Sequence, residues 1–215
     1  MTAVINSLCT GMPKIVNDNG REVLTGIWKH PVENRVNVHA LGIEGDGQAD
    51  LTVHGGHDKA VYAYPKKHYA TWAEELGVDE LEPAQFGENL TVSEIDEDNV
   101  RIGDRVRFGT VTAIVAQPRL PCFKLAIRMA DKTFPQRFLK SGRLGLYLRI
   151  EEEGETGVGD AFEVVEPAVH DFTITRLWEI VFGGSRNAAD AASALEFMPY
   201  LDEGWVRRLR MIAER

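Results

Sequence analysis

The chain has 215 residues, of which 44% are hydrophobic and 27% are charged, and its formal net charge is −9. These proportions are typical of a globular protein, and the length suits one full-sized domain with an appendage. The negative charge argues against broad binding of nucleic acid or membrane surfaces, because phosphate backbones require a basic face. Any anion that this protein binds must therefore meet a local basic pocket.

The N-terminus, Met-Thr-Ala-Val-Ile, lacks the basic and apolar regions of a signal peptide. No apolar run approaches the roughly 20 residues of a membrane span. We therefore expect a cytoplasmic protein. Cys9 and Cys122 are the two cysteines and lie far apart in the sequence, so each is expected to remain a thiol in a reducing cytosol.

Short strands dominate the chain before Pro167. Period-two or β-branched patterns predict strands at 36–38, 60–64, 105–108, 111–116, 146–150 and 162–165. Gly103-Asp104 and Gly159-Asp160 precede two of these strands, and glycine and aspartate suit tight turns. Many short strands with glycine turns predict a barrel or a sandwich.

One helix interrupts these strands. Pro65 suits the first turn of a helix and Gly77 suits its end. Between them, apolar residues recur with helical spacing at Tyr69, Trp72, Ala73 and Leu76.

After Pro167 the pattern becomes helical. An apolar stripe at 174–181 ends at Gly183-Gly184, a second helix is expected at 188–198, and Trp205, Leu209 and Ile212 mark a third. We predict a mainly β domain at 1–167 and a three-helix domain at 168–215 that packs on it. Such a tail is a reasonable site for contacts with a partner or for a homodimer.

A dense polar cluster lies at His54-Gly55-Gly56-His57-Asp58-Lys59. The glycines upstream of it do not have the spacing of a dinucleotide fingerprint, and no helix follows them. A zinc site would take His54 and His57 with Asp46, Asp58 or His68, but no cysteine pair supports it.

Two other interpretations of this cluster remain. A structural turn needs the glycines but not the polar residues. An anion-binding and proton-donating loop uses both: backbone N–H groups and Lys59 bind phosphate, while His54, His57 or Asp58 performs acid–base chemistry. We favour the anion-binding loop.

Two further segments gain meaning only from their context. In "FGENL" (86–90), Glu88 and Asn89 either orient a ligand or hydrogen-bond a turn that Gly87 permits. In "TGIWKHPV" (25–32), Lys29 and His30 precede a proline, and a lone lysine in a loop is usually solvated.

The segment "QPRLPCFKL" (117–125) places Cys122 between Arg119 and Lys124. These cations are expected to lower the pKa of the thiol and favour the thiolate, which is the form that binds metals and attacks electrophiles. Pro118 and Pro121 indicate a fixed, irregular backbone. A metal ligand, a Cys–His nucleophile with His54 or His57, and a buried cysteine that serves as a small hydrophobe remain open interpretations.

The ordered set "TGIWKHPV", "LGIEGDGQADLTVHGGHDKAVYAYP", "HYATWAEELG", "FGENL", "IGDRVRFG", "QPRLPCFKL" and "SGRLGLYLRI" resembles the MOSC domain family, named for the C-terminal domain of molybdenum cofactor sulfurase, in its YiiM-like branch. The resemblance runs from about Thr25 to Val165. It implies a MOSC-type β-barrel with interspersed helices, followed by a three-helix domain.

The resemblance also implies that molybdenum cofactor (molybdopterin) binds here, with Cys122 as the molybdenum ligand. A soft thiolate suits a sulfur-rich metal centre. The same resemblance places the cofactor contacts at Lys29, His54, Gly55, Lys59, Asn89 and Arg119.

Members of this branch reduce N-hydroxylated compounds, including hydroxylaminopurine-type base analogues, to amines. Our hypothesis for the mechanism is removal of the oxygen atom at molybdenum, with Cys122, His57 and Asp58 as catalytic residues and His57, Asp58 or water as the proton donor. Too few cysteines are present for a four-cysteine iron–sulfur cluster, so a separate reductase is expected to supply electrons.

The sequence departs from the family pattern at two positions. His57 stands where proline is frequent, and it would add an acid near the pocket. Leu146 replaces a usual aromatic residue and would widen the pocket.

Two alternatives to a reductase stay open. The protein would be a non-catalytic carrier if it delivered the cofactor, or sulfur as a persulfide on Cys122. No aminotransferase-like segment is present, which argues against a complete sulfurase that uses pyridoxal phosphate. A cysteine hydrolase would instead be labelled at Cys122 by an acyl electrophile without metal.

Overall fold

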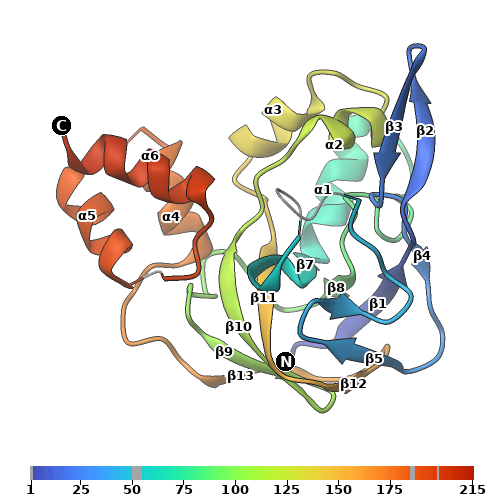
Figure 1. The fold of residues 1–215 in the computed structure, drawn as a ribbon, viewed down its shortest axis with the longest axis horizontal. Coiled ribbons are helices and arrows are strands. Elements are labelled where there is room, and N and C mark those ends of the chain that lie inside the picture. The colour runs from blue at the N-terminus through green and yellow to red at the C-terminus, as the bar shows by residue number, and fades with distance from the viewer. Residues whose placement is uncertain (1, 50–54, 185–186, 198) are drawn as a thin grey trace.

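The computed structural model describes residues 2–49, 55–184, 187–197 and 199–215 (Figure 1). The fold is mixed and sheet-rich, and the described residues contain six α-helices. An eight-stranded sheet forms the centre, and smaller sheets of three and two strands complete it. His54, one of the predicted site residues, lies outside the described residues.

The central sheet has the strand order β13-β9-β10-β11-β7-β8-β1-β4, and within it β7 and β8 are a parallel pair. Its strands are β1 (Ile5–Thr10), β4 (His30–Pro31), β7 (Val61–Pro65), β8 (Leu90–Val92), β9 (Arg105–Phe108), β10 (Val111–Pro118), β11 (Leu146–Glu152) and β13 (Phe162–Glu166). The smaller sheets contain β12 (Gly154–Thr156), β5 (Val36–His39) and β6 (Gly42–Ile43), and the hairpin of β2 (Lys14–Asp18) and β3 (Arg21–Thr25). All six strands expected from the sequence are confirmed.

The strand ladders among the described residues do not close into the predicted barrel. β1 approaches the other end of the sheet at an isolated bridge between Val4 and Ala161, where Ile5 N also donates to Asp160 O at 2.9 Å. A turn at Gly159, with φ of 89°, directly precedes this bridge and takes the backbone out of extended geometry. The chain at the start of β1, the strand next to one end of the sheet, therefore contacts the chain before β13, at the other end, without forming a ladder.

The helix α1 (Lys67–Leu76) follows β7 directly. Its predicted start at Pro65 is wrong, because Pro65 is the last residue of β7 and pairs with Val92 of β8. Its predicted end is confirmed: Gly77 adopts φ of 67°, and its N–H donates to Glu74 O. The fully buried Trp72 packs α1 against Phe134 and Phe138.

Two short helices, α2 (Phe123–Arg128) and α3 (Phe134–Lys140), were not expected from the sequence. They are too short to show a helical period, and Pro135 lies in the first turn of α3, where a missing N–H carries little cost. A single 3₁₀ turn, η1 (His57–Lys59), carries part of the polar cluster.

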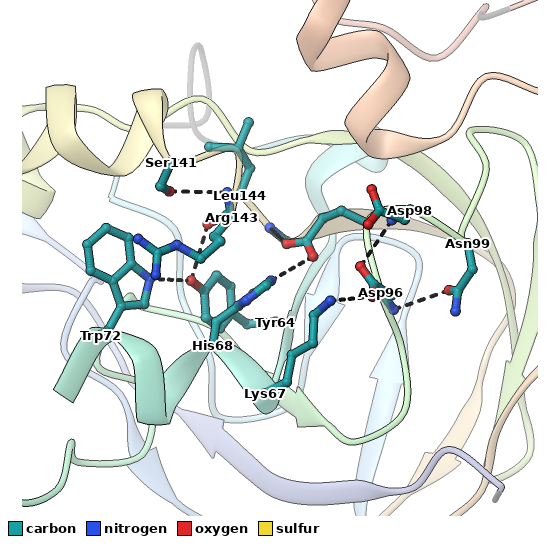
Figure 2. A network of polar contacts seen from close by, with 12 residues as sticks. Tyr64, Lys67, His68, Trp72, Asp96, Asp98, Asn99, Ser141, Arg143 and Leu144 are labelled. Atoms are coloured by element: carbon teal, nitrogen blue, oxygen red, sulfur yellow. Dashed lines mark hydrogen bonds and ion pairs between the residues drawn. The ribbon is translucent and has the colours of Figure 1, made fainter. Parts of the chain in front are cut away.

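A buried polar network ties α1 to the loop before β11 (Figure 2). His68 Nε2 lies 2.7 Å from Glu97 Oε2, and Gly145 N donates to the other Glu97 oxygen at 3.0 Å. Trp72 Nε1 donates to Tyr64 Oη at 2.8 Å, and that hydroxyl donates to the Arg143 carbonyl at 3.2 Å. His68, an alternative zinc ligand in the sequence, is thus part of the interior that supports α1.

The tail contains α4 (Ile174–Val181), α5 (Ala188–Phe197) and α6 (Glu203–Ala213), so the three expected helices are confirmed. Met198, the expected end of the second helix, lies outside the described residues. The side chains of Thr173 and Asp202 cap α4 and α6 by accepting backbone N–H bonds. Leu177, Trp205 and Leu209 belong to the same apolar cluster as residues of the central sheet. The core is continuous across residue 167, and a domain boundary there stays a prediction.

In the part of the chain that the structure describes, we find no helix with the length and hydrophobicity needed to cross a membrane.

A continuous core predicts that a cavity in the tail will weaken the sheet as well. Leu209→Ala should lower the free energy of unfolding by about 2–5 kcal/mol, because it removes buried methyl groups and leaves a cavity. Urea unfolding followed by circular dichroism and tryptophan fluorescence should give a single shifted transition.

Met211→Ala is the matched control on the same helix, since Met211 is 55% exposed. Its effect should stay within about 0.5 kcal/mol. A Leu209→Ala protein whose tail melts early while the sheet unfolds at the wild-type urea concentration would contradict the continuous core.

Candidate functional site

A cleft brings together five of the residues that the sequence predicted: Lys29, Lys59, Asn89, Arg119 and Cys122. They come from segments that are distant in the sequence. Lys29 follows β3, Lys59 ends η1, Asn89 precedes β8, Arg119 follows β10 and Cys122 precedes α2. The cleft therefore lies where the ends of central-sheet strands meet η1 and the segment after the β2–β3 hairpin.

The cleft is locally basic in a chain whose net charge is negative. Its charged lining residues in the described chain are Asp46 and four cationic side chains, Lys29, Lys59, Arg119 and Lys124. This excess of positive charge is what an anion site requires in an acidic protein.

A buried ion pair between Lys29 and Asp46 forms one wall. Lys29 is 9% exposed, and burial lowers its pKa while the Asp46 carboxylate opposes that shift. Asp46 also accepts hydrogen bonds from Gly11 N at 2.9 Å and from Asn89 Nδ2 at 2.9 Å. Because each group holds the others, both Lys29 and Asn89 have fixed positions.

Asn89 also connects the strands behind the cleft. Its backbone N–H donates to Tyr62 O at 2.8 Å, and its side-chain oxygen accepts from Tyr62 N at 3.1 Å. Its backbone oxygen accepts from Cys9 N at 2.7 Å. The residue therefore has a structural function in addition to its predicted contact with a cofactor.

Arg119 is buried beneath the cleft. Its guanidinium lies 4.7 Å from the centre of the Tyr62 ring and donates to the Phe86 carbonyl. Burial alone lowers the pKa of Arg119, but the neighbouring Tyr62, Tyr147 and Cys122 groups raise it above its usual value. The side chain therefore keeps its charge at the cleft.

Cys122 is half-buried and is not in a disulfide. Its backbone is extended, with φ of −124° and ψ of 175°, and its carbonyl accepts from Leu125 N at 3.0 Å as α2 begins. Pro118 ends β10 on the other side. As the two prolines predicted, the thiol lies on a short irregular segment between two regular elements.

His57 and Asp58 do not line the cleft that contains Cys122. They border a second hollow, between η1 and α6, together with Gly55. His57 is exposed, and Asp58 forms an ion pair with Arg149 at 2.6 Å. Lys59 borders both hollows. The catalytic assignment of His57 and Asp58 stays a prediction.

One disfavoured alternative and one expectation receive no support. Among the described residues, which do not include His54, no group of three or more His, Cys, Asp and Glu side chains is arranged to hold a metal, so the zinc alternative gains nothing. Leu146 does not widen the cleft, because it is fully buried in the core.

The tail contacts the cleft through residues that sequence reasoning missed. Asp202 forms an ion pair with Lys59 at 2.8 Å, and its N–H donates to Gln117 Oε1 at 3.2 Å. Trp205 Nε1 donates to the Pro118 carbonyl at 3.1 Å. The local sequence at Asp202 indicates a helix cap. It contains no pattern that indicates pairing with a lysine far upstream.

Glu88 lies fully buried behind the cleft. It accepts hydrogen bonds from Phe86 N at 3.1 Å, from Thr91 Oγ1 at 3.3 Å and from the Tyr69 hydroxyl. Burial raises the pKa of its carboxyl, although these hydrogen bonds oppose the shift. Gly87 beside it has φ of 83°, and a Cβ there would lie 2.7 Å from Ile27 Cγ1, so glycine is required.

Comparison with known proteins places this geometry in a family. The sequence profile of the MOSC domain matches residues 50–163. The chain is 43% identical over 159 residues to the uncharacterized protein YflK of Bacillus subtilis, covering 74% of this chain and 72% of that protein. It is 32% identical over 188 residues to the protein YiiM of Escherichia coli, covering 86% and 77%.

A more distant relative and a solved structure extend the comparison. A protein named "Reductase" from Gibberella moniliformis is 30% identical over 165 residues, which are 75% of this chain and 29% of that protein. The crystal structure of YiiM from Geobacillus stearothermophilus superposes with a TM-score of 0.80 at 31% identity, covering 98% of each chain.

The buried Glu88 predicts a pH-dependent effect of Glu88→Gln. The pKa of the Glu88 carboxyl is raised in the native state. At pH values above the usual glutamate pKa of about 4.3, Glu88 therefore stays protonated in a larger fraction of native molecules than of unfolded molecules. Its contribution to stability is therefore present at low pH and is lost as pH rises through the native pKa. The stability of Glu88→Gln relative to wild type should increase from pH 4 to pH 7 in urea titrations.

Glu80→Gln, which changes an exposed carboxyl, controls for the loss of one negative charge. A relative stability of Glu88→Gln that falls over the same pH range would contradict the raised pKa.

Proposed function

Because the chain belongs to the MOSC domain family, we propose that it is a molybdenum-cofactor-dependent reductase that converts N-hydroxylated compounds, including hydroxylaminopurine-type base analogues, to amines. The observation that carries this proposal is the cleft, in which a half-buried thiol lies among four cationic side chains. The fungal relative named "Reductase" supports an oxidoreductase role.

The side chains of the cleft fit this cofactor by their chemistry. Cys122 offers a soft thiolate of the kind that suits a sulfur-rich metal centre. Lys29, Lys59 and Arg119 offer charge-assisted hydrogen bonds to a phosphate. The Asn89 amide already donates to Asp46 and to the Cys9 carbonyl, so its predicted contact with the cofactor stays a prediction. In this proposal Cys122 binds molybdenum and the three cationic residues hold the pterin phosphate.

The cofactor, when bound, supplies an electron pair for the reduction. The overall reaction turns an N-hydroxyl group into an amine and water, and it consumes an electron pair and a pair of protons. We propose that His57, Asp58 or a bound water supplies the proton. His57 is exposed, and His57 and Asp58 lie on the short helix that also carries Lys59, the residue that borders both hollows.

Electrons come from a separate reductase in this proposal. The sequence holds two cysteines, one of which is the proposed molybdenum ligand, so it has too few for a four-cysteine iron–sulfur cluster.

The thiol assignment predicts that Cys122→Ser loses both metal and activity. When the protein is expressed in a host that makes molybdenum cofactor, elemental analysis should show molybdenum in wild type and a large loss in the variant. Hydroxylamine reduction with an artificial electron donor should fall in parallel.

Cys9→Ser is the matched control, because Cys9 is the other cysteine, is buried beside Ser7 and is not among the residues that line the cleft. It should keep its molybdenum. Wild-type metal content and activity in Cys122→Ser would overturn the proposal.

The basic wall predicts weaker phosphate binding in Lys59→Gln. Loss of one charge-assisted contact should weaken binding of inorganic pyrophosphate to the cofactor-free protein by about tenfold, measured by calorimetry. Lys67→Gln is the control, since Lys67 also forms an ion pair, with Asp96, but lies outside the cleft. Equal losses in the two variants would contradict a specific phosphate site.

One observation favours the carrier alternative. The proposed proton donors His57 and Asp58 lie outside the cleft that contains Cys122, and a carrier needs no proton donor. Tightly bound cofactor with no turnover of any compound in a panel of N-hydroxylated substrates would support a carrier and contradict the reductase.

A further inference from the structure

A third hollow also borders Cys122. Its lining residues come from the turn of the β2–β3 hairpin and from α2 with its flanks. Cys122 lines this groove as well as the basic cleft. A molecule in the groove would therefore lie next to the residue that is proposed to hold the metal.

One wall of the groove is apolar. It comes from α2 and its flanks, and Phe123 is 52% exposed there despite its large ring. Ala126, Ile127 and Pro135 extend the same wall. Aromatic and aliphatic walls with a few polar groups are typical of small-molecule sites, and an exposed aromatic face stacks on flat rings.

The facing wall is polar. It is the hairpin turn Asn17-Asp18-Asn19, which carries two amides and a carboxylate. The turn is held in place by Gly20 N, which donates to Asn17 Oδ1 at 2.8 Å, and by Asn19 Nδ2, which donates to Asp18 Oδ1 at 2.8 Å. Amide groups on a fixed turn can hydrogen-bond the edge of a heterocycle that stacks on the opposite wall.

The charge of the groove differs from that of the basic cleft. The charged lining residues in the groove are Asp18, Asp131 and Lys132, and Arg137 pairs with Asp131 at 3.5 Å from outside the lining. The groove is thus near neutral and lacks the positive excess of the cleft. A phosphate would gain little electrostatic binding energy in this groove. An uncharged ring does not depend on positive charge, so its binding is not weakened.

We propose that this groove is the substrate site, and that it takes the flat, uncharged ring of an N-hydroxylated aromatic or heteroaromatic compound in preference to a phosphorylated nucleotide. The inference rests on the proposed reductase function. It separates two ligands by charge: the anionic cofactor occupies the basic cleft and the neutral substrate occupies the groove, with Cys122 between them.

Cofactor-free protein tests the groove independently of catalysis. The probes are 2-aminopurine, a flat and neutral fluorescent base, and its ribonucleoside 5′-monophosphate, both measured by fluorescence titration in saturating inorganic pyrophosphate, which occupies the basic cleft. Wild type should bind the base more tightly than the monophosphate. Phe123→Ser should weaken binding of the base by about tenfold, because it removes the aromatic side chain on which the base stacks.

Val169→Ser is the matched control, since Val169 is an apolar side chain that is 97% exposed and lies outside the groove lining. It should bind the base as wild type does. Asp18→Lys adds positive charge to the groove and should strengthen binding of the monophosphate relative to the base. The ratio of the dissociation constant of the monophosphate to that of the base should therefore fall by about threefold to tenfold.

Three results would overturn the inference: unchanged base affinity in Phe123→Ser, tighter binding of the monophosphate by wild type, or an unchanged preference in Asp18→Lys. In cofactor-loaded protein, Phe123→Ser should raise KM more for a ring substrate than for hydroxylamine. If loaded wild type reduces nothing while base binding still depends on Phe123, the groove stands as a ring site and the reductase assignment alone fails.

Discussion

The buried ion pair of Lys29 and Asp46 is the interaction on which the geometry of the cleft depends. Both charges leave water, so each needs partners, and Asp46 finds them in Gly11 N and the Asn89 side chain. Asn89 in turn bonds the backbone of Tyr62 in β7. The Asp46 carboxylate thereby joins the segments of Gly11, Lys29 and Asn89, and Asn89 connects them to β7. Breaking the ion pair would leave an uncompensated buried charge.

Cys122 lies between a positively charged hollow and a nearly neutral one. The basic cleft forms on the side of Lys29 and Arg119, while the near-neutral groove forms on the side of Phe123 and the hairpin turn. The position of one residue at the border of both hollows is a matter of chain geometry: β10 ends at Pro118 and α2 begins directly after Cys122. Because the connection between β10 and α2 is this short, Cys122 lies at the border of both hollows.

The tail has a direct connection to this site. Asp202 pairs with Lys59, and Trp205 bonds the carbonyl of Pro118 at the end of β10. Because α6 also contributes Trp205 and Leu209 to the apolar cluster of the sheet, its position is set by the core. The helices therefore stabilise two walls of the cleft while they cover one side of the sheet.

The sequence by itself determined six of the strands, the three tail helices and the end of α1, because these depend on local period and turn residues. The role of Cys122 stays a prediction from motif order. The predicted start of α1 at Pro65 is wrong, since a proline suits a strand end as well as a helix start. The pairing of Asp202 with Lys59, the place of His57 outside the cleft and the groove beside Phe123 were decided only by tertiary structure. Each depends on contacts between segments distant in the chain, and no local pattern encodes such contacts.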